Sequence, residues 1–177
     1  MIGVVAGYAQ ALYSLAGEES VAHEVLQQLE ALSVGFSQEP DFLRLLATPN
    51  LSKAERCQIL DESFRGKVHL YVLNTLKLMT EEGHIRRFGD FVRQYRDIYN
   101  EANGIICVLA TSAVELTAEQ KEKLQTKLET ITGKTVQLQC QVEPACVGGV
   151  RLDYDGKRID GTVKNRLDAM KELLNGT

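Results

Sequence analysis

The sequence lacks the features of a membrane span, a secretory signal and a nucleic-acid-binding surface. No apolar run in its 177 residues reaches the roughly 18 needed to cross a bilayer, so we expect no direct membrane insertion. Met1–Ala11 carries no basic residue, unlike a secretory signal, and we therefore expect a cytoplasmic protein. The formal net charge is −4 and neither half of the chain is strongly basic, which argues against nucleic acid as a partner.

Metal and nucleotide motifs are missing as well. The four cysteines share no Cys-x-x-Cys spacing, and the three histidines are not spaced to join them as zinc ligands. We expect reduced, mostly buried thiols and no metal site. Gly148 and Gly149 do not have the spacing of a phosphate loop and precede strand-like residues. They predict a bulge or a close backbone approach rather than a cofactor site.

What is present is a helical period over the first hundred residues. Six helices with short breaks predict a helical bundle over residues 1–103. The breaks fall at Pro40 and Pro49, and Ser52 with Glu55 forms a capping box that begins the fourth helix. The predicted inward stripes include Val4, Tyr8, Leu12 and Leu15 in the first helix, and Val25, Leu29, Leu32 and Phe36 in the second. The fifth helix, over residues 68–82, is apolar on most sides.

The pattern changes near Asn103, and residues 104–177 predict a small α/β domain. A buried strand at 105–110 is followed by a helix that begins at the Thr117 capping box. Its inward residues are predicted to be Leu124, Leu128 and Ile131. Alternation over 136–142, then a hairpin around 150–154 and a C-terminal helix, complete a β-α-β-β pattern. The fold class is therefore an α+β two-domain protein.

Asp160, Gly161 and Thr162 look at first like a catalytic signature. The three histidines all lie in the helical half, far along the chain from Asp160. No nucleophile or acid lies near them at a spacing typical of a catalytic site. A short polar residue before an apolar-periodic run instead predicts the start of a helix. We expect no catalytic residue, and a small hydrolase using Asp160 is disfavoured because every partner group is missing.

Two stretches resemble a known family. "GGVRLDYDGKRIDGTVKNRLDAM", from Gly148 to Met170, and more weakly "YAQALYSLA", from Tyr8 to Ala16, are similar to the delta subunits of bacterial F-type ATP synthases. The mitochondrial counterpart is the oligomycin-sensitivity-conferring protein. The resemblance extends over the whole chain in length and domain order. The family more often has Ser in place of Thr162 and Gly in place of Asn165, and Thr keeps the hydroxyl.

The resemblance implies a non-catalytic stator subunit without a cofactor. Such a subunit joins the top of the catalytic head to the peripheral stalk, so that the head resists the torque of the rotor. The helical domain of the family holds the N-terminal helix of an alpha subunit between its first and fifth helices. On this chain, the stripes expected to line that groove are Tyr8, Ala11, Leu12 and Leu15 on the first helix, and Thr75, Leu78, Met79 and Glu82 on the fifth.

The second domain is implied to meet the C-terminal region of the b subunits. Lys164, Arg166 and Lys171 are the residues expected to contact them. The resemblance further implies one copy per membrane-attached complex, on the cytoplasmic side of the cell (inner) membrane. In this interpretation Gly148, Gly149, Asp160, Gly161 and Thr162 form a structural signature rather than an active site.

One alternative belongs to another class of protein. A small acidic helical bundle also suits an RNA-binding antitermination-type factor. Such a factor needs a basic surface, and Arg86, Arg87, Arg93 and Arg96 form the only basic cluster in the helical half. Acidic neighbours such as Glu82 and Asp90 reduce the net positive charge of that cluster.

Overall fold

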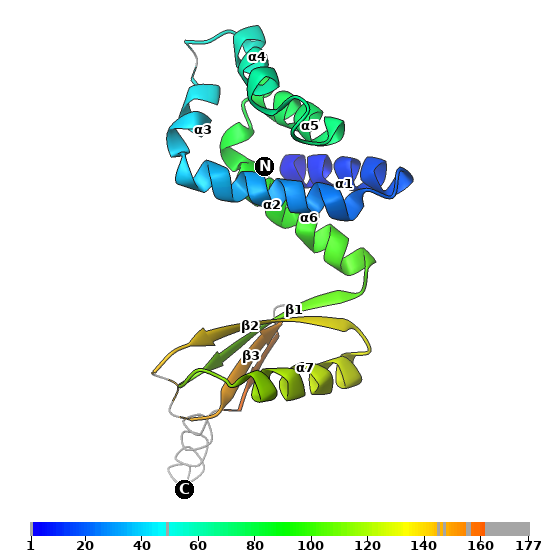
Figure 1. Cartoon of the computed structure of the whole chain (residues 1–177), viewed down its shortest axis with the longest axis vertical. Helices are drawn as coiled ribbons and strands as arrows, with labels where there is room; N and C mark the ends of the chain where they lie inside the picture. Colours follow the sequence, from blue (N-terminus) through cyan, green and yellow to red (C-terminus); the bar gives the residue numbers. More distant parts are fainter. Residues whose placement is uncertain (1, 49, 145, 147, 155–156, 162–177) are drawn as a thin grey trace, which may run out of the picture. The chain divides into compact units, whose positions relative to one another are not determined.

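The structure is a computed structural model that describes residues 2–48, 50–144, 146, 148–154 and 157–161. The chain divides into two compact units, Met1–Ala102 and Asn103–Thr177. The fold is mixed α/β: the described residues form seven α-helices, one short 3-10 helix and a four-stranded sheet (Figure 1). None of the helices in the described ranges is both long and apolar enough to cross a membrane.

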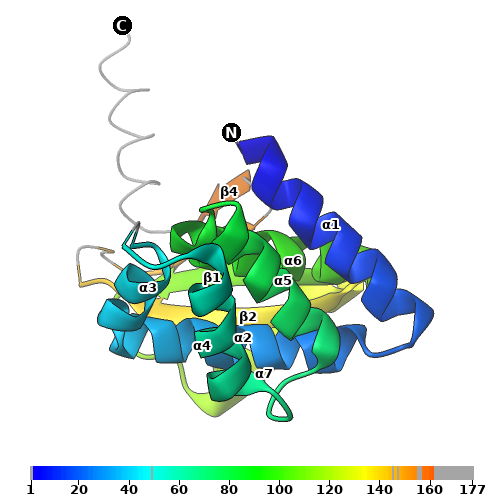
Figure 2. The same ribbon diagram turned by 90° about the horizontal axis from the view of Figure 1, so that it is seen from above.

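All regular secondary structure described in the first unit is helical. Twenty buried apolar side chains form one continuous core, with Tyr95, Phe88 and Phe91 among the largest. Both views of the molecule show α1 lying beside α5 (Figures 1 and 2). The elements are α1 (Ile2–Glu18), α2 (Ala22–Gln38), α3 (Pro40–Leu46), α4 (Lys53–Phe64), α5 (Leu70–Glu81), η1 (Ile85–Arg87) and α6 (Phe88–Ala102).

The buried face of α1 is not the predicted one. Val5, Ala9, Leu12 and Ala16 are buried at i, i+4, i+7 and i+11, which is the spacing of one helix face. Val4 and Leu15, predicted inward, are instead half-exposed, and Tyr8 is only partly buried. The small residues Ala9 and Ala16 turn inward, because they let α1 pack closely on its neighbours. The larger side chains beside them are left on the surface.

The predicted start of α4 is confirmed. The Ser52 hydroxyl accepts a hydrogen bond from the Glu55 backbone amide, and the Glu55 carboxylate accepts one from the Ser52 amide at 2.8 Å. These bonds hold the pKa of Glu55 below its usual range. The far end of α4 is joined to α5 by an ion pair between Asp61 and Lys77 at 2.7 Å.

The Asp61–Lys77 pair makes a pH-dependent contribution to stability. The hydrogen bond from Lys77 is the main cause that lowers the pKa of Asp61 in the folded state. The pair therefore stabilises the fold above the unfolded carboxyl pKa of about 4, and this contribution is lost as the pH falls through the lower folded value. We expect Asp61→Asn to flatten the stability profile between neutral and acid pH. Urea unfolding at several pH values checks this, with the exposed Asp41→Asn as the control; equal slopes for Asp61→Asn and wild type would contradict it.

The second unit is built around a mixed sheet. Its elements are β1 (Ile105–Ser112), α7 (Ala118–Thr132), β2 (Thr135–Val142), β3 (Val150–Tyr154) and β4 (Lys157–Asp160). The strand order is β2-β1-β3-β4, with β1 parallel to β2 and antiparallel to β3. α7 covers one face, where Leu128 packs on Ile106, Val108 and Val136 (Figure 1). The Thr117 capping box and the left-handed Gly133 bound α7 as predicted.

Two predictions for this unit are wrong. Ile131 was expected to face inward, but its side chain is 80% exposed near the end of α7. The thiols are not mostly buried: Cys107 and Cys140 are exposed, and among the four cysteines only Cys146 is fully buried. The predicted C-terminal helix lies outside the described residues.

Candidate functional site

A groove runs between α1 and α5 on the surface of the first unit. Its volume is about 290 Å³. The α1 wall and the α5 wall each contribute an i, i+3, i+4, i+7 stripe, the set of positions that lies on one face of a helix. The lining residues are Tyr8, Ala11, Leu12 and Leu15 from α1, and Tyr71, Asn74, Thr75 and Leu78 from α5.

The groove is apolar, and part of that apolar surface is open to water. Leu15 is 45% exposed and Leu78 is 44% exposed, one on each wall. Ala11 is exposed and carries only a methyl group, which leaves room between the walls for another backbone to approach. Paired half-exposed leucines on two neighbouring helices are typical of a surface that receives an apolar helix face.

Two hydroxyl groups at the groove are already engaged within the chain. The Tyr71 hydroxyl donates to the Glu19 carboxylate at 2.6 Å, which raises the pKa of Tyr71. The Thr75 hydroxyl donates to the Tyr71 backbone carbonyl at 2.8 Å. The His84 ring lies 6.2 Å from the Tyr8 ring, between centroids. With the Tyr71 and Thr75 hydroxyls engaged in this way, most of the groove surface that remains open is apolar.

In the second unit, the glycines of the signature stretch have a backbone role. Gly148 and Gly149 have φ angles of +70° and +89°, which side chains rarely adopt. Gly161 donates its amide to the Val150 carbonyl at 3.2 Å, where the end of β4 meets the start of β3. A Cβ on Gly161 would lie 3.2 Å from that same oxygen. Asp160 belongs to β4 rather than to a loop.

We expect Gly161→Ala to destabilise the second unit by about 1 kcal/mol, because its Cβ would press on the Val150 carbonyl. Gly133→Asn is a useful comparison, since Gly133 is left-handed but a Cβ there meets no atom within 4 Å, and Asn tolerates that conformation. Thermal unfolding monitored by circular dichroism measures both. A Gly161→Ala protein as stable as wild type would contradict the close approach.

Comparison with known proteins gives the family. Residues 4–174 match the family model described as ATP synthase delta (OSCP) subunit. The chain belongs to this family. The ATP synthase subunit delta of Alkaliphilus oremlandii is 35% identical over 168 residues, covering 95% of this chain and 93% of the relative. The subunit delta of Clostridioides difficile is 32% identical over 177 residues, covering 99% and 98%.

A chain in a solved structure shares the fold of this protein. A chain in the mitochondrial ATP synthase hexamer of Toxoplasma gondii superposes with a TM-score of 0.72 at 20% identity, covering 96% of both chains. At this identity the likeness concerns the fold. The family match at higher identity is what sets the antitermination-factor alternative aside.

The basic cluster of that alternative is also partly neutralised. Arg96 forms an ion pair with Glu30 at 2.7 Å, and Arg87 forms one with Asp90 at 3.4 Å. The histidines likewise have structural contacts: His23 shares a 3.1 Å hydrogen bond with the Tyr99 hydroxyl, and His69 accepts from the Tyr71 amide at the start of α5. Among the described residues no group of three or more His, Cys, Asp or Glu side chains could hold a metal ion.

The structure brings together six of the eight residues predicted for the groove. Met79 is a correction: its side chain is 0% exposed and belongs to the core, so it does not line the groove. Glu82 follows the last turn of α5 and is exposed, but it does not line the groove either. The predicted stripe on α5 began one turn too late.

Tyr71 and Asn74 are the two lining residues that the sequence analysis missed. The signal was available, because Tyr71, Asn74, Thr75 and Leu78 repeat the spacing of the α1 stripe. Of the delta-family residues predicted for the second unit, Gly148, Gly149, Asp160 and Gly161 are described. Thr162, Lys164, Arg166 and Lys171 lie outside the described residues.

Proposed function

We propose that this chain is the non-catalytic stator subunit of an F-type proton-translocating ATP synthase. It would join the alpha subunits at the top of the catalytic head to the b subunits of the peripheral stalk, as one copy per complex. Its place would be peripheral, on the cytoplasmic side of the cell (inner) membrane. Family membership supports the assignment to the complex, and the α1/α5 groove supports the contact with the head.

We further propose that the six helices of the first unit act as one bundle that holds the N-terminal helix of an alpha subunit in this groove. The observation that carries this is the pair of facing stripes with half-exposed Leu15 and Leu78. Each 100 Å² of apolar surface that an occupant covers contributes roughly 2.5 kcal/mol, against association costs of roughly 4–15 kcal/mol. A contact that must resist torque therefore needs several hundred Å² of apolar burial, which a helix lying along both stripes provides.

The second unit is proposed to contact the C-terminal region of the b subunits. Lys164, Arg166 and Lys171 remain the candidate contact residues for acidic groups of the stalk. No chemical step is assigned to either unit. The subunit works by remaining bound while torque acts on it.

The test is a calorimetric titration of the protein with a peptide of about 20 residues from the N-terminus of the same organism's alpha subunit. We expect submicromolar binding that Ala11→Arg weakens strongly, because the Arg side chain would occupy the space above Ala11. Gln10→Arg is the matched control, since Gln10 is exposed on α1 but does not line the groove. Absence of peptide binding by the folded protein would contradict the proposed contact with the alpha subunit.

A further inference from the structure

The two edges of the sheet in the second unit differ in how well they are protected against pairing with another strand. The strand order β2-β1-β3-β4 places β2 at one edge and β4 at the other. The strand β4 has four residues, KRID, and three of them are charged. The strand β2 has eight, TVQLQCQV, with no charge, proline or glycine. Natural proteins usually shorten or charge an edge strand, because a long uncharged one is a template for another strand.

Alternate residues of β2 direct their backbone groups toward β1 and away from it. The Thr135 amide donates to the Gly104 carbonyl at 3.1 Å. The Glu143 amide donates to the Ser112 carbonyl at 2.8 Å, so the odd-numbered residues face β1 at both ends of the strand. The register between the two strands is constant, and the even-numbered residues therefore direct their amides and carbonyls away from the sheet. This outward set is Val136, Leu138, Cys140 and Val142.

Side chains of α7 engage only the first of these outward residues. The Glu129 carboxylate accepts from the Val136 amide at 3.2 Å, and the Gln125 side-chain amide donates to the Val136 carbonyl at 3.0 Å. Within the described part of the chain, the outward backbone groups of the other three residues have no such partner. Of these three, Cys140 is exposed and Val142 is 48% exposed. The second half of β2 thus presents unpaired backbone groups together with apolar side chains.

This half of β2 is complementary to itself in one antiparallel register, centred on Cys140. In that register Leu138 lies opposite Val142 of a second copy, on one face of the joined sheet. On the other face, Gln139 lies opposite Gln141. The three outward residues then pair only with one another, and each pair exchanges two backbone hydrogen bonds. A shift of two residues sets one of them against the position that α7 already engages, or beyond the end of the strand.

We propose that β2 is a self-association edge, through which two copies of this chain pair antiparallel about Cys140 and join their sheets. A second copy is the occupant because the strand supplies its own apolar and glutamine partners and offers no charge to a charged one. The contact is short, so we expect weak association, with a dissociation constant on the order of 0.1 mM. It uses no residue of the α1/α5 groove and does not depend on the proposed stator role.

Oxidative trapping of the reduced full-length protein tests the pairing. Opposite residues in a hydrogen-bonded antiparallel pair have Cα atoms about 5.5 Å apart, within the range that a disulfide spans. Diamide takes one hydrogen from each of two thiols and is itself reduced, and the two sulfurs join. We expect a covalent dimer on non-reducing electrophoresis for wild type and Cys107→Ser, and none for Cys140→Ser. Cys107 is the matched control, because it is exposed on the neighbouring strand β1; a dimer linked through Cys107 would overturn the proposal.

Two double substitutions at the exposed residues Gln139 and Gln141 test the register. Gln139→Lys with Gln141→Lys sets lysine opposite lysine twice in the dimer and should slow trapping about fivefold. Gln139→Lys with Gln141→Glu sets lysine opposite glutamate and should trap at least as fast as wild type. Alkylation by uncharged iodoacetamide corrects for changes in thiol reactivity.

Sedimentation velocity measures the same association without oxidant. The wild type and the lysine–glutamate variant should sediment faster as their concentration rises through the expected dissociation constant, and the lysine–lysine variant should not. Equal trapping of the two double variants would overturn the proposed register. A wild-type protein that stays monomeric at several times that concentration, and gives no trapped dimer, would overturn the self-association itself.

Discussion

Met79→Asp is expected to unfold the first unit. The Met79 side chain is 0% exposed and packs in the core of the first unit. Burying an unpaired carboxylate there, with loss of the thioether packing, should cost about 4 kcal/mol or more, a large part of the stability of a typical domain. Urea unfolding monitored by circular dichroism measures the loss.

The comparison that makes this result informative is Leu78→Asp. Leu78 is the neighbouring residue on α5, but it lines the groove and is 44% exposed. Its aspartate would stay hydrated, and we expect a loss of about 1 kcal/mol. Equal destabilisation by the two substitutions would contradict the assignment of Met79 to the core and Leu78 to the groove.

Leu78→Asp is expected to weaken binding of the alpha-subunit peptide by about a hundredfold. The substitution removes an apolar anchor from one wall of the groove and places a carboxylate where the apolar face of the peptide would lie. A hundredfold change corresponds to about 2.7 kcal/mol, which is within the range of a central interface residue. Calorimetric titration with the same peptide gives the affinity.

The matched control is Leu70→Asp. Leu70 is the same residue type at the start of the same helix, it is 62% exposed, and it does not line the groove. Its substitution should leave the affinity unchanged within about twofold. If both aspartates weaken binding equally, the effect is one of overall charge, and the peptide does not lie in the α1/α5 groove.

Local rules in the sequence predicted the elements of the fold well. The capping boxes at Ser52 and Thr117 fix where α4 and α7 begin, because each depends on residues only three positions apart. The strand β2 and the hairpin of β3 with β4 were predicted on the same kind of evidence, although Cys140 and Val142, predicted on the inner face of β2, are exposed. Signals of this kind need no knowledge of the neighbouring elements.

The phase of a helix was harder to predict than its existence. On α5, apolar residues occupy both the core face, with Met79, and the groove face, with Leu78, so periodicity alone does not say which face is inside. On α1 the same ambiguity led to the prediction that Val4 faces inward, whereas Val5 is the buried residue. The choice is made by close packing between helices, and small residues such as Ala9 decide it.

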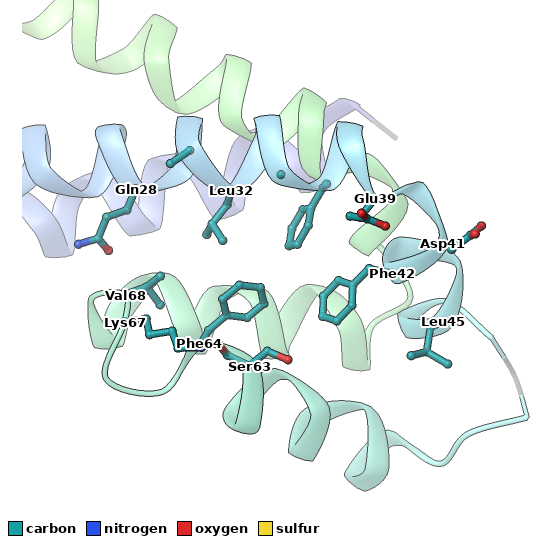
Figure 3. Close-up of a pocket in the computed structure, with 13 residues that line it drawn as sticks. Gln28, Leu32, Glu39, Asp41, Phe42, Leu45, Ser63, Phe64, Lys67 and Val68 are labelled. Atoms are coloured by element: carbon teal, nitrogen blue, oxygen red, sulfur yellow. Dashed lines mark hydrogen bonds between the residues drawn. The ribbon is translucent and has the colours of Figure 1, made fainter.

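A second apolar cavity of the first unit, lined by Phe36, Phe42 and Phe64 between α2, α3 and the end of α4, could not be predicted from the sequence at all (Figure 3). Phe36, Phe42 and Phe64 come from α2, α3 and α4, and no fixed spacing joins them. By its sequence pattern, each of these phenylalanines is an ordinary inward residue of its own helix. Only the packing of the three helices shows that two of these rings remain partly open to solvent.

The most direct test of the proposed stator role is chemical-shift mapping of the isotopically labelled protein with the alpha-subunit peptide. The account predicts that the largest amide shifts fall on the two stripes of the groove, around Ala11 and Leu15 on α1 and Asn74 and Leu78 on α5. Shifts centred instead on Phe42 and Phe64, in the cavity between α2, α3 and the end of α4, would contradict binding of the peptide in the α1/α5 groove. Absence of any shift at saturating peptide would contradict the proposed contact with the catalytic head itself.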